Sequence, residues 1–314
     1  MKNKPFTFLK ILFLCTIILF SLQTKVIAQN NLKDAEYVVP TLSPDALPYN
    51  PEKPEELQAN QLYAKSAILI DFDTGKTIFE KNANEIMYPA STTKIFTTYL
   101  GIMLGDMQQT VYLSKEAADV PLDSSTIGLK VGESIKMKDL LYATMICSGN
   151  EGSNLITEII SGSPLLFTNL MNQMANAIGC KSTHFSNAHG YFDVSHFTTA
   201  RDMAHITRTA MINEIFRDIA TTGKYTLPKS NMSNERTIVS STNEMLDDSI
   251  KNNEFYYPYA IGIKTGYHSR AGYCFVGAAQ KEDTTLLSVV FYTSETGRWT
   301  DTIKLMEYGF SQVM

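Results

Sequence analysis

The chain has 314 residues, of which 44% are hydrophobic and 19% charged, so it can form one large domain or two small ones. Its formal net charge of -5 and the lack of a local basic cluster argue against a nucleic-acid partner. One Trp, 16 Tyr and 16 Phe suit an ordinary globular core.

Residues 1–28 are predicted to be a secretory signal peptide. Three lysines fall within the first ten residues, residues 11–22 are almost wholly apolar, and V-I-A at 26–28 offers a cleavage site. The apolar run is short for a membrane span. We therefore expect an exported protein that works in the cell wall or at the outer face of the cytoplasmic membrane. It would contact the membrane only if this segment is retained as an anchor.

Cysteine usage does not suggest a disulfide framework. Loss of Cys15 with the signal peptide leaves Cys147, Cys180 and Cys274, which is an odd number, and no C-x-x-C pattern occurs. We expect free thiols that are buried or partly buried, as is usual for unpaired cysteine.

Residues 29–60 are polar and contain five prolines, so they are predicted to form a lead-in or linker. We expect a single catalytic domain over residues 61–314, without a second domain after it. Residues 66–70 predict a strand, a turn follows at 73–76, and residues 77–80 predict the returning strand.

The rest of the domain is predicted to be helical in its middle and strand-rich at its end. Apolar residues recur at helical spacing in five segments, 95–103, 137–145, 155–160, 167–178 and 199–211, with a loop at 183–197. Strands are predicted at 259–264, 273–279 and 286–291, and a closing helix at 299–310. This order predicts one α+β domain whose terminal segments share an antiparallel sheet.

Residues 91–94 read S-T-T-K, at the start of the first predicted helix. Ser91 and Lys94 are three residues apart and lie on one helix face, which brings an amine close to a hydroxyl. A serine becomes nucleophilic when a base takes its proton, and a lysine can be that base only if burial or a second cation lowers its pKa. Free N–H groups at the helix start could stabilise an oxyanion. The same S-x-x-K pattern also fits an exposed serine that caps a helix, followed by an exposed lysine without a catalytic role.

Residues 148–150 read S-G-N at the end of a predicted helix. There Ser148 could relay a proton, and the Asn150 amide could hold a substrate carbonyl. An ordinary turn explains the same residues, since serine, glycine and asparagine are turn formers.

Residues 264–266 read K-T-G at a predicted strand end. Lys264 could hold a carboxylate or lower the pKa of Lys94, and the Thr265 hydroxyl could bind the same carboxylate. Gly266 would let a substrate lie against the strand edge. The alternative is an edge strand with a solvated lysine.

The three motifs occur once each, in the order that is the signature of penicillin-binding proteins and serine β-lactamases. Over residues 60–310 the chain resembles low-molecular-mass penicillin-binding proteins of the D-alanyl-D-alanine carboxypeptidase type. The segments that carry this resemblance are 73–75, 89–94, 148–151, 167–172, 183–187, 196–204, 263–267, 271–272 and 308–310. The resemblance implies a β-lactamase/penicillin-binding-protein-like fold.

The resemblance also implies a two-step acyl transfer without metal or cofactor. Ser91 would attack the carbonyl between two D-alanines of a peptidoglycan stem peptide, Lys94 would accept its proton, and Ser148 would pass a proton to the leaving amine. Water would then hydrolyse the acyl-enzyme. β-Lactam antibiotics would act as inhibitors because they acylate Ser91 and the resulting acyl-enzyme is hydrolysed slowly.

Substrate-binding roles follow from the same resemblance. Lys264 and Thr265 would hold the terminal carboxylate together with Arg298, which is assigned by approximate spacing. The backbone N–H groups of Ser91 and Tyr267 would form the oxyanion hole.

The chain departs from the family pattern at three points. Cys147 precedes S-G-N where a small residue or proline is expected, and His268 follows Tyr267 where threonine is more familiar. Many relatives carry a β-rich second domain and an amphipathic anchor after the catalytic domain, and we expect neither here. Membrane attachment would therefore depend on the signal segment.

Other functions remain open at this point. A class A β-lactamase needs a glutamate that positions water, and residues 183–200 contain none. A zinc peptidase could use His184, His189, Asp193 and His196, although no H-E-x-x-H occurs. A wall-binding protein with an inactive site, a DD-endopeptidase that cuts crosslinks, and a transpeptidase are further alternatives.

Overall fold

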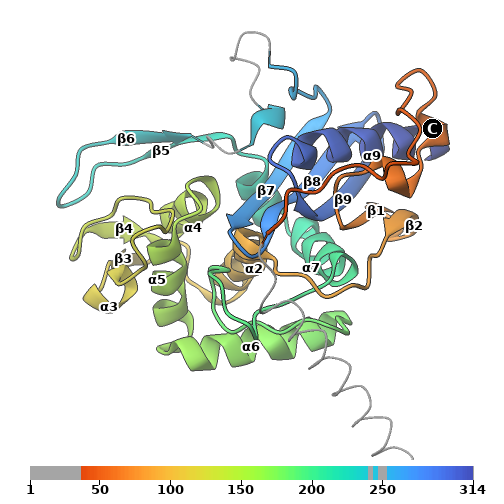
Figure 1. Ribbon diagram of the computed structural model, residues 1–314. Helices are drawn as coiled ribbons and strands as arrows, with labels where there is room; N and C mark the ends of the chain where they lie inside the picture. Colours follow the sequence, from red (N-terminus) through yellow and green to blue (C-terminus); the bar gives the residue numbers. More distant parts are fainter. Residues whose placement is uncertain (1–36, 240–242, 247–252, 314) are drawn as a thin grey trace, which may run out of the picture. The chain divides into compact units, whose positions relative to one another are not determined.

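The computed structural model describes residues 37–239, 243–246 and 253–313 (Figure 1). The predicted signal peptide, with Cys15, and the first part of the predicted linker lie outside the described residues. Within the described ranges, no helix has the length and apolarity that a membrane span requires. The three described cysteines, Cys147, Cys180 and Cys274, are free thiols.

A five-stranded antiparallel sheet is built from both ends of the domain, in the order β2-β1-β9-β8-β7 (Figure 1). Its strands are β1 (Ser66–Asp71), β2 (Thr77–Lys81), β7 (Ala260–His268), β8 (Gly272–Lys281) and β9 (Thr284–Thr293). Every residue of β1 pairs with a residue of β9. The predicted α+β fold, with one sheet shared by the terminal segments, is therefore confirmed.

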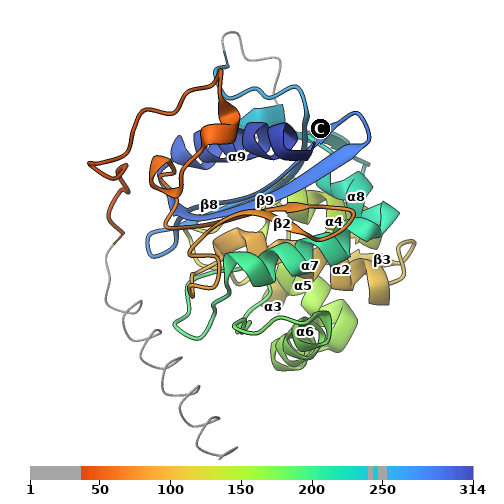
Figure 2. The ribbon, with the colours of Figure 1, turned by 90° about the vertical axis from the view of Figure 1, so that its right-hand side faces the viewer.

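Helices cover both faces of this sheet (Figure 2). Helix α9 (Gly297–Val313) packs on β8 and β9 from one side, and α7 (Ala200–Ile212) packs on β1 and β9 from the other. On the α9 side, the ring of Trp299 lies 4.9 Å from that of Phe275, edge to face. Burial on both faces explains why β8 and β9 contain nearly continuous apolar runs in place of a strict alternation.

The helices of the middle form a second, mainly helical part of the domain. They are α2 (Lys94–Leu104), α3 (Lys115–Ala118), α4 (Met137–Ile146), α5 (Asn150–Ser161), α6 (Pro164–Ile178) and α8 (Glu214–Ala220). α6 begins with a proline in its first turn and ends at Gly179, whose φ of 103° is left-handed. This is the usual arrangement of helix ends, and it confirms the predicted end of that helix.

Helix α8 and two small antiparallel hairpins have no counterpart among the elements predicted from the sequence. These hairpins pair β3 (Thr110–Tyr112) with β4 (Ser134–Lys136), and β5 (Lys224–Leu227) with β6 (Arg236–Val239). Strands of three or four residues are too short to show a clear period, and α8 has only seven residues. Its start is marked by Asn213, whose side chain accepts a hydrogen bond from Phe216 N.

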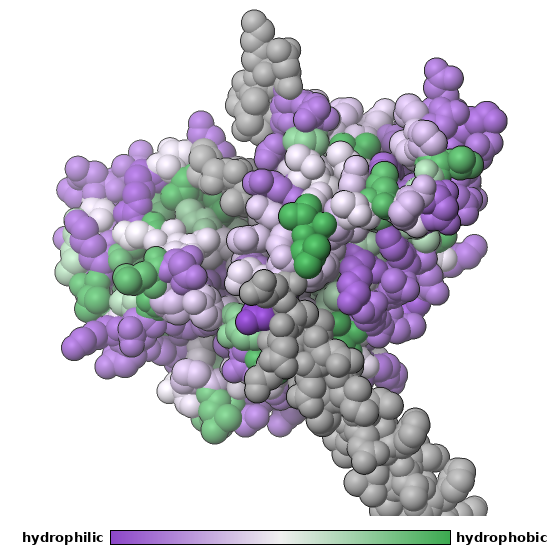
Figure 3. Space-filling model, in the orientation of Figure 1, coloured by the Kyte–Doolittle hydropathy of each residue, from purple (hydrophilic) through white to green (hydrophobic). Residues whose placement is uncertain are grey.

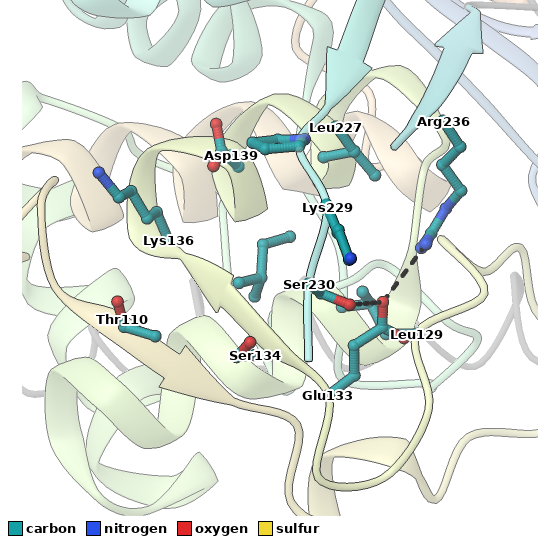
Figure 4. A pocket seen from close by; sticks show the side chains of 12 residues that line it. Thr110, Leu129, Glu133, Ser134, Lys136, Asp139, Leu227, Lys229, Ser230 and Arg236 are labelled. Atoms are coloured by element: carbon teal, nitrogen blue, oxygen red, sulfur yellow. Dashed lines mark hydrogen bonds and ion pairs between the residues drawn. The ribbon is translucent and has the colours of Figure 1, made fainter. Parts of the chain in front are cut away.

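The two small hairpins meet around a cavity of about 190 Å³ (Figure 4). Glu133, 1% exposed, accepts hydrogen bonds there from Ser230 Oγ at 2.8 Å and Arg236 Nη1 at 3.3 Å. Asn231 accepts a further bond from Ser134 N at 2.7 Å. Polar contacts thus attach the β5–β6 hairpin to the helical part.

The surface is mostly hydrophilic where Figure 3 shows described residues, and the apolar side chains on that face form small separate patches.

Candidate active site

Ser91 lies in a 3₁₀ turn, Ala90–Thr93, and α2 begins only at Lys94. The predicted helix start at Ser91 is thus a 3₁₀ turn that runs directly into the α-helix. In a 3₁₀ turn the side chains three residues apart are eclipsed, so the tighter turn brings the pair closer. Lys94 Nζ lies 3.1 Å from Ser91 Oγ, within hydrogen-bond distance.

Lys94 is completely buried, and its amine is held by three oxygens. Besides Ser91 Oγ, these are Asn150 Oδ1 at 2.7 Å and the carbonyl oxygen of His189 at 2.8 Å. Burial, with the positive charge of Lys264, holds the pKa of Lys94 well below its usual range, although the Glu151 carboxylate opposes this shift. A neutral amine beside a serine hydroxyl is the arrangement that a general base requires.

Asn150, the first residue of α5, connects this amine to a nearby loop. Its side-chain nitrogen donates to Ser124 Oγ at 2.9 Å, and its backbone N–H donates to the carbonyl of Ser125 at 2.9 Å. Ser148 precedes it in the link between α4 and α5, with a left-handed φ of 57° and a side chain that is 5% exposed. Such backbone conformations cluster at functional sites.

Glu151 holds a second part of the same loop. Its Oε1 accepts hydrogen bonds from Ile127 N at 2.6 Å and Gly128 N at 3.0 Å. A Cβ at Gly149 would lie 2.5 Å from Ile127 Cγ1, so the glycine makes room for this side chain. The S-G-N-E segment, residues 148–151, therefore holds the loop of residues 124–128 in place.

The K-T-G motif lies within β7, which extends four residues beyond the predicted end of that strand. β7 is an edge strand of the sheet, as its order shows. A Cβ at Gly266 would lie 3.0 Å from Ser91 N and 3.0 Å from Pro89 O. The absence of a side chain at Gly266 thus lets the strand backbone pass directly beside the Ser91 N–H, with Tyr267 as the next residue.

Lys264 adds a second buried cation near Lys94. Its side chain is 3% exposed, and its Nζ donates to the carbonyl of Thr265 at 3.2 Å. Burial, opposed by the effect of Cys147 and assisted by the charge of Arg298, lowers the pKa of Lys264 to about 7. The Arg298 guanidinium lies 4.9 Å from the Tyr273 ring centroid, and its charge acts on Lys264.

A cavity of about 300 Å³ opens beside these groups. Of the predicted site residues, Ser91, Asn150 and Tyr267 line it. The other lining residues are Asp123, Ser124, Ser125, Gly190, Tyr191, Phe192, His268 and Ser269. The other predicted site residues do not line it: Lys94, Ser148, Lys264, Thr265 and Gly266 are buried, and Arg298 is half-buried.

Residues 123–125 form a wall of this cavity that was not predicted from the sequence. Their only signal is a run of turn-forming residues between Pro121 and Gly128, which marks a loop but not what the loop faces. The role of the His189 carbonyl was not predicted either. Every residue has a backbone carbonyl, so the sequence does not mark which one will accept a hydrogen bond.

The four residues considered as zinc ligands do not converge. No group of three or more His, Cys, Asp or Glu side chains suited to a metal occurs among the residues the structure describes. His196 Nε2 lies 2.8 Å from Thr93 Oγ1, and its Nδ1 accepts from Ser186 N at 3.1 Å. Burial holds the pKa of His196 well below its usual range, so this neutral ring supports the turn that carries Ser91.

Comparison with known proteins identifies relatives over most of the chain. The family model of D-alanyl-D-alanine carboxypeptidases, peptidase S11, matches residues 53–295. The D-alanyl-D-alanine carboxypeptidase DacF of Bacillus subtilis is 34% identical over 79% of this chain and 62% of its own length. DacC of Escherichia coli is 32% identical over 82% of this chain and 63% of its own length. The chain thus spans about three fifths of these relatives.

Solved structures agree with this result. The Streptomyces K15 DD-transpeptidase matches with a TM-score of 0.72 and 30% identity, over 79% of this chain and 97% of that one. The D-alanyl-D-alanine carboxypeptidase of Mycobacterium tuberculosis matches with a TM-score of 0.71 and 28% identity, over 87% of this chain and 96% of that one.

Gly190 provides a test of how the Ser91 turn is supported. Its φ is 86°, and a Cβ there would overlap the carbonyl oxygen of Ala90, the residue before Ser91. We expect Gly190→Ala to lower the free energy of unfolding by about 3 kcal/mol, from overpacking and backbone strain. Urea unfolding followed by circular dichroism measures this.

Gly223→Ala is the matched control, because no atom lies within 4 Å of the added Cβ. It should leave the unfolding free energy within about 0.5 kcal/mol of the wild type. Equal effects of the two substitutions would contradict the packing of Gly190 against Ala90.

Proposed function

Since this chain belongs to the D-alanyl-D-alanine carboxypeptidase family, we propose that it is a serine-type carboxypeptidase that removes the terminal D-alanine from peptidoglycan stem peptides. The observation that carries the proposal is the 3.1 Å contact between Ser91 Oγ and the buried amine of Lys94. We further propose that it acts outside the cytoplasm, without a nucleic-acid partner, metal or cofactor.

The first step is acylation of the serine. Neutral Lys94 takes the proton of Ser91 Oγ as that oxygen attacks the carbonyl between the two D-alanines. The N–H of Ser91 and the N–H of Tyr267 stabilise the oxyanion. The location of Gly266 beside Ser91 N supports this assignment, because it places the strand backbone next to that N–H group.

The leaving group then needs a proton, and Ser148 is the residue assigned to relay it from Lys94. The terminal D-alanine departs with its amine protonated, and the acyl group stays on Ser91 as an ester. Water attacks this ester in the second step, with Lys94 again available as the base. The oxygen of Ser91 is released with its proton restored, so the enzyme returns to its starting state.

The terminal carboxylate of the substrate is assigned to Lys264, Thr265 and Arg298. A cationic Lys264 attracts the carboxylate and also lowers the pKa of Lys94, so one residue supports binding and the availability of the neutral base together. Asn150 is assigned to the substrate amide carbonyl. The Asn150–Lys94 contact of 2.7 Å supports this role, because it fixes the side-chain amide at the site.

The named relatives favour the carboxypeptidase over the β-lactamase alternative, since the curated relatives compared above bear the name of D-alanyl-D-alanine carboxypeptidases. The Streptomyces K15 DD-transpeptidase supports a second candidate, transfer of the same acyl group to an amine. Both reactions proceed through the Ser91 ester and differ in which nucleophile resolves it.

A covalent adduct with benzylpenicillin tests the mechanism directly. We expect incubation with the drug to add one penicilloyl group to the intact mass of the protein, and Ser91→Ala to show no adduct. D-alanine release from a D-alanyl-D-alanine peptide should be lost in the same variant.

Three outcomes separate the alternatives. A persistent adduct with D-alanine release supports the carboxypeptidase. Rapid drug consumption without an adduct would indicate a β-lactamase. An intact drug and no adduct would contradict the proposed nucleophile.

The pH dependence of acylation tests the role of Lys94. Lys94 must be neutral to act, so the rate should fall as the pH drops through its pKa. Lys264→Met removes a cation that lowers this pKa, so the acid limb should move to higher pH. The rate should also fall roughly 10- to 100-fold, because a charged partner of the carboxylate is lost.

Glu151→Gln is the opposite control. It removes a negative charge that raises the pKa of Lys94, so the acid limb should move to lower pH. Stopped-flow acylation over a pH series measures both limbs. Shifts in the same direction in the two variants would contradict Lys94 as the titrating base.

A further inference from the structure

The cavity beside Ser91 contains one charged group that the proposed mechanism does not use. Among the residues that line it, Asp123 alone carries a charge at neutral pH. His268 also lines it, but burial lowers the pKa of its ring to about 4, which leaves it neutral. The other lining side chains are hydroxyl, amide, aromatic or absent.

Asp123 is held close to the nucleophile. Three successive hydrogen bonds lead from Ser91 Oγ through Lys94 and Asn150 to Ser124 Oγ, at 3.1, 2.7 and 2.9 Å. Asp123 directly precedes Ser124 in the chain, so its Cα is about 3.8 Å from that of Ser124. The S-G-N-E segment holds this loop in place, and Asp123 lines the same cavity as Ser91. The carboxylate therefore belongs to the site and not to a distant surface.

A second loop orients the Asp123 side chain. The hydroxyl of Tyr191 donates to Asp123 Oδ1 at 3.1 Å, and both residues line the same cavity. The residue is exposed, and Oδ2 makes no hydrogen bond to the described part of the protein. One oxygen is thus anchored while the other remains available to a ligand.

The charges around the site differ in sign along the path of a bound peptide. Lys264 and Arg298 are cations at the end assigned to the terminal carboxylate. His268, the last residue of β7, and Ser269, which follows the strand, line the same cavity, and an extended peptide advances only about 3.3 Å per residue. The residue before the two D-alanines would therefore still lie at this cavity, where Asp123 supplies the negative charge.

Another cation lies near this part of the cleft. The guanidinium of Arg270 is 5.9 Å from the ring centroid of Phe192, which lines the cavity. Arg270 itself is not among the lining residues. Of these two charged side chains, Asp123 lines the cavity and Arg270 does not.

We propose that Asp123 selects stem peptides in which the residue before D-alanyl-D-alanine carries a free side-chain amine. The carboxylate would form an ion pair with this ammonium group, and Tyr191 is a positioning residue that holds the carboxylate in the cavity. The proposal rests on the proposed function and adds a determinant of substrate choice to it.

The test compares two peptides that differ by one charge. Nα-acetyl-L-lysyl-D-alanyl-D-alanine has a free amine, whereas the Nα,Nε-diacetyl peptide does not. We expect the wild type to have a higher kcat/KM for the free amine. Asp123→Asn should reduce this ratio roughly two- to fivefold, the range of a single solvent-accessible ion pair. Added salt should reduce the wild-type ratio as well.

Two control variants separate charge from shape. Asp119→Asn removes an equal charge from an exposed residue of the same segment that does not line the cavity, so the ratio should stay at the wild-type value. Tyr191→Phe removes the hydrogen bond but keeps the carboxylate, so a preference for the amine should persist. Benzylpenicillin adduct formation in each variant shows that the nucleophile is intact.

The outcomes distinguish this proposal from the proposed function. Release of D-alanine from both peptides, with a ratio that Asp123→Asn leaves unchanged, would overturn the role of Asp123 alone. An equal loss of preference in Asp119→Asn would also overturn it, since a diffuse field would then explain the effect. If the wild type released D-alanine from neither peptide, the proposed function would fail and this proposal with it.

Discussion

The burial of Lys94 is the constraint on which the rest of the site depends. A lysine amine in water is protonated at neutral pH and cannot accept a proton from serine. Complete burial and the nearby Lys264 cation lower its pKa, while three oxygens lie within hydrogen-bond distance of the amine inside the protein. The fold must therefore bring these oxygens together from α5, from the 3₁₀ turn and from the loop at His189.

Close backbone contacts bring these separate segments together. Gly266 allows β7 to pass beside Ser91 N, and Gly190 allows a loop to touch the Ala90 carbonyl. Gly149 leaves room for the side chain of Ile127, which follows residues 123–125 in the loop that lines the cavity. Because each contact lacks space for a side chain, the relative positions of sheet, turn and loop are restricted to a narrow range.

Long periodic segments were the most predictable part of the fold. The strands of the main sheet and helices such as α6 carry enough apolar residues to show their period. The short hairpins, α8 and the 3₁₀ turn at Ser91 do not show a period. Each of their helices and strands has only three to seven residues, which is at most about two repeats of the pattern. Their conformations depend on partners distant in the chain, such as Glu133 with Ser230 and Arg236.

The sequence by itself determined the chemical types at the site, because the order of S-x-x-K, S-G-N and K-T-G specifies a serine, an amine and a strand for which carboxylate binding is predicted. Only the tertiary structure decided the burial of Lys94, the use of the His189 carbonyl and the presence of Asp123 in the cavity. Burial and distance arise from segments far apart in sequence, and no local pattern of residues records which of them will meet.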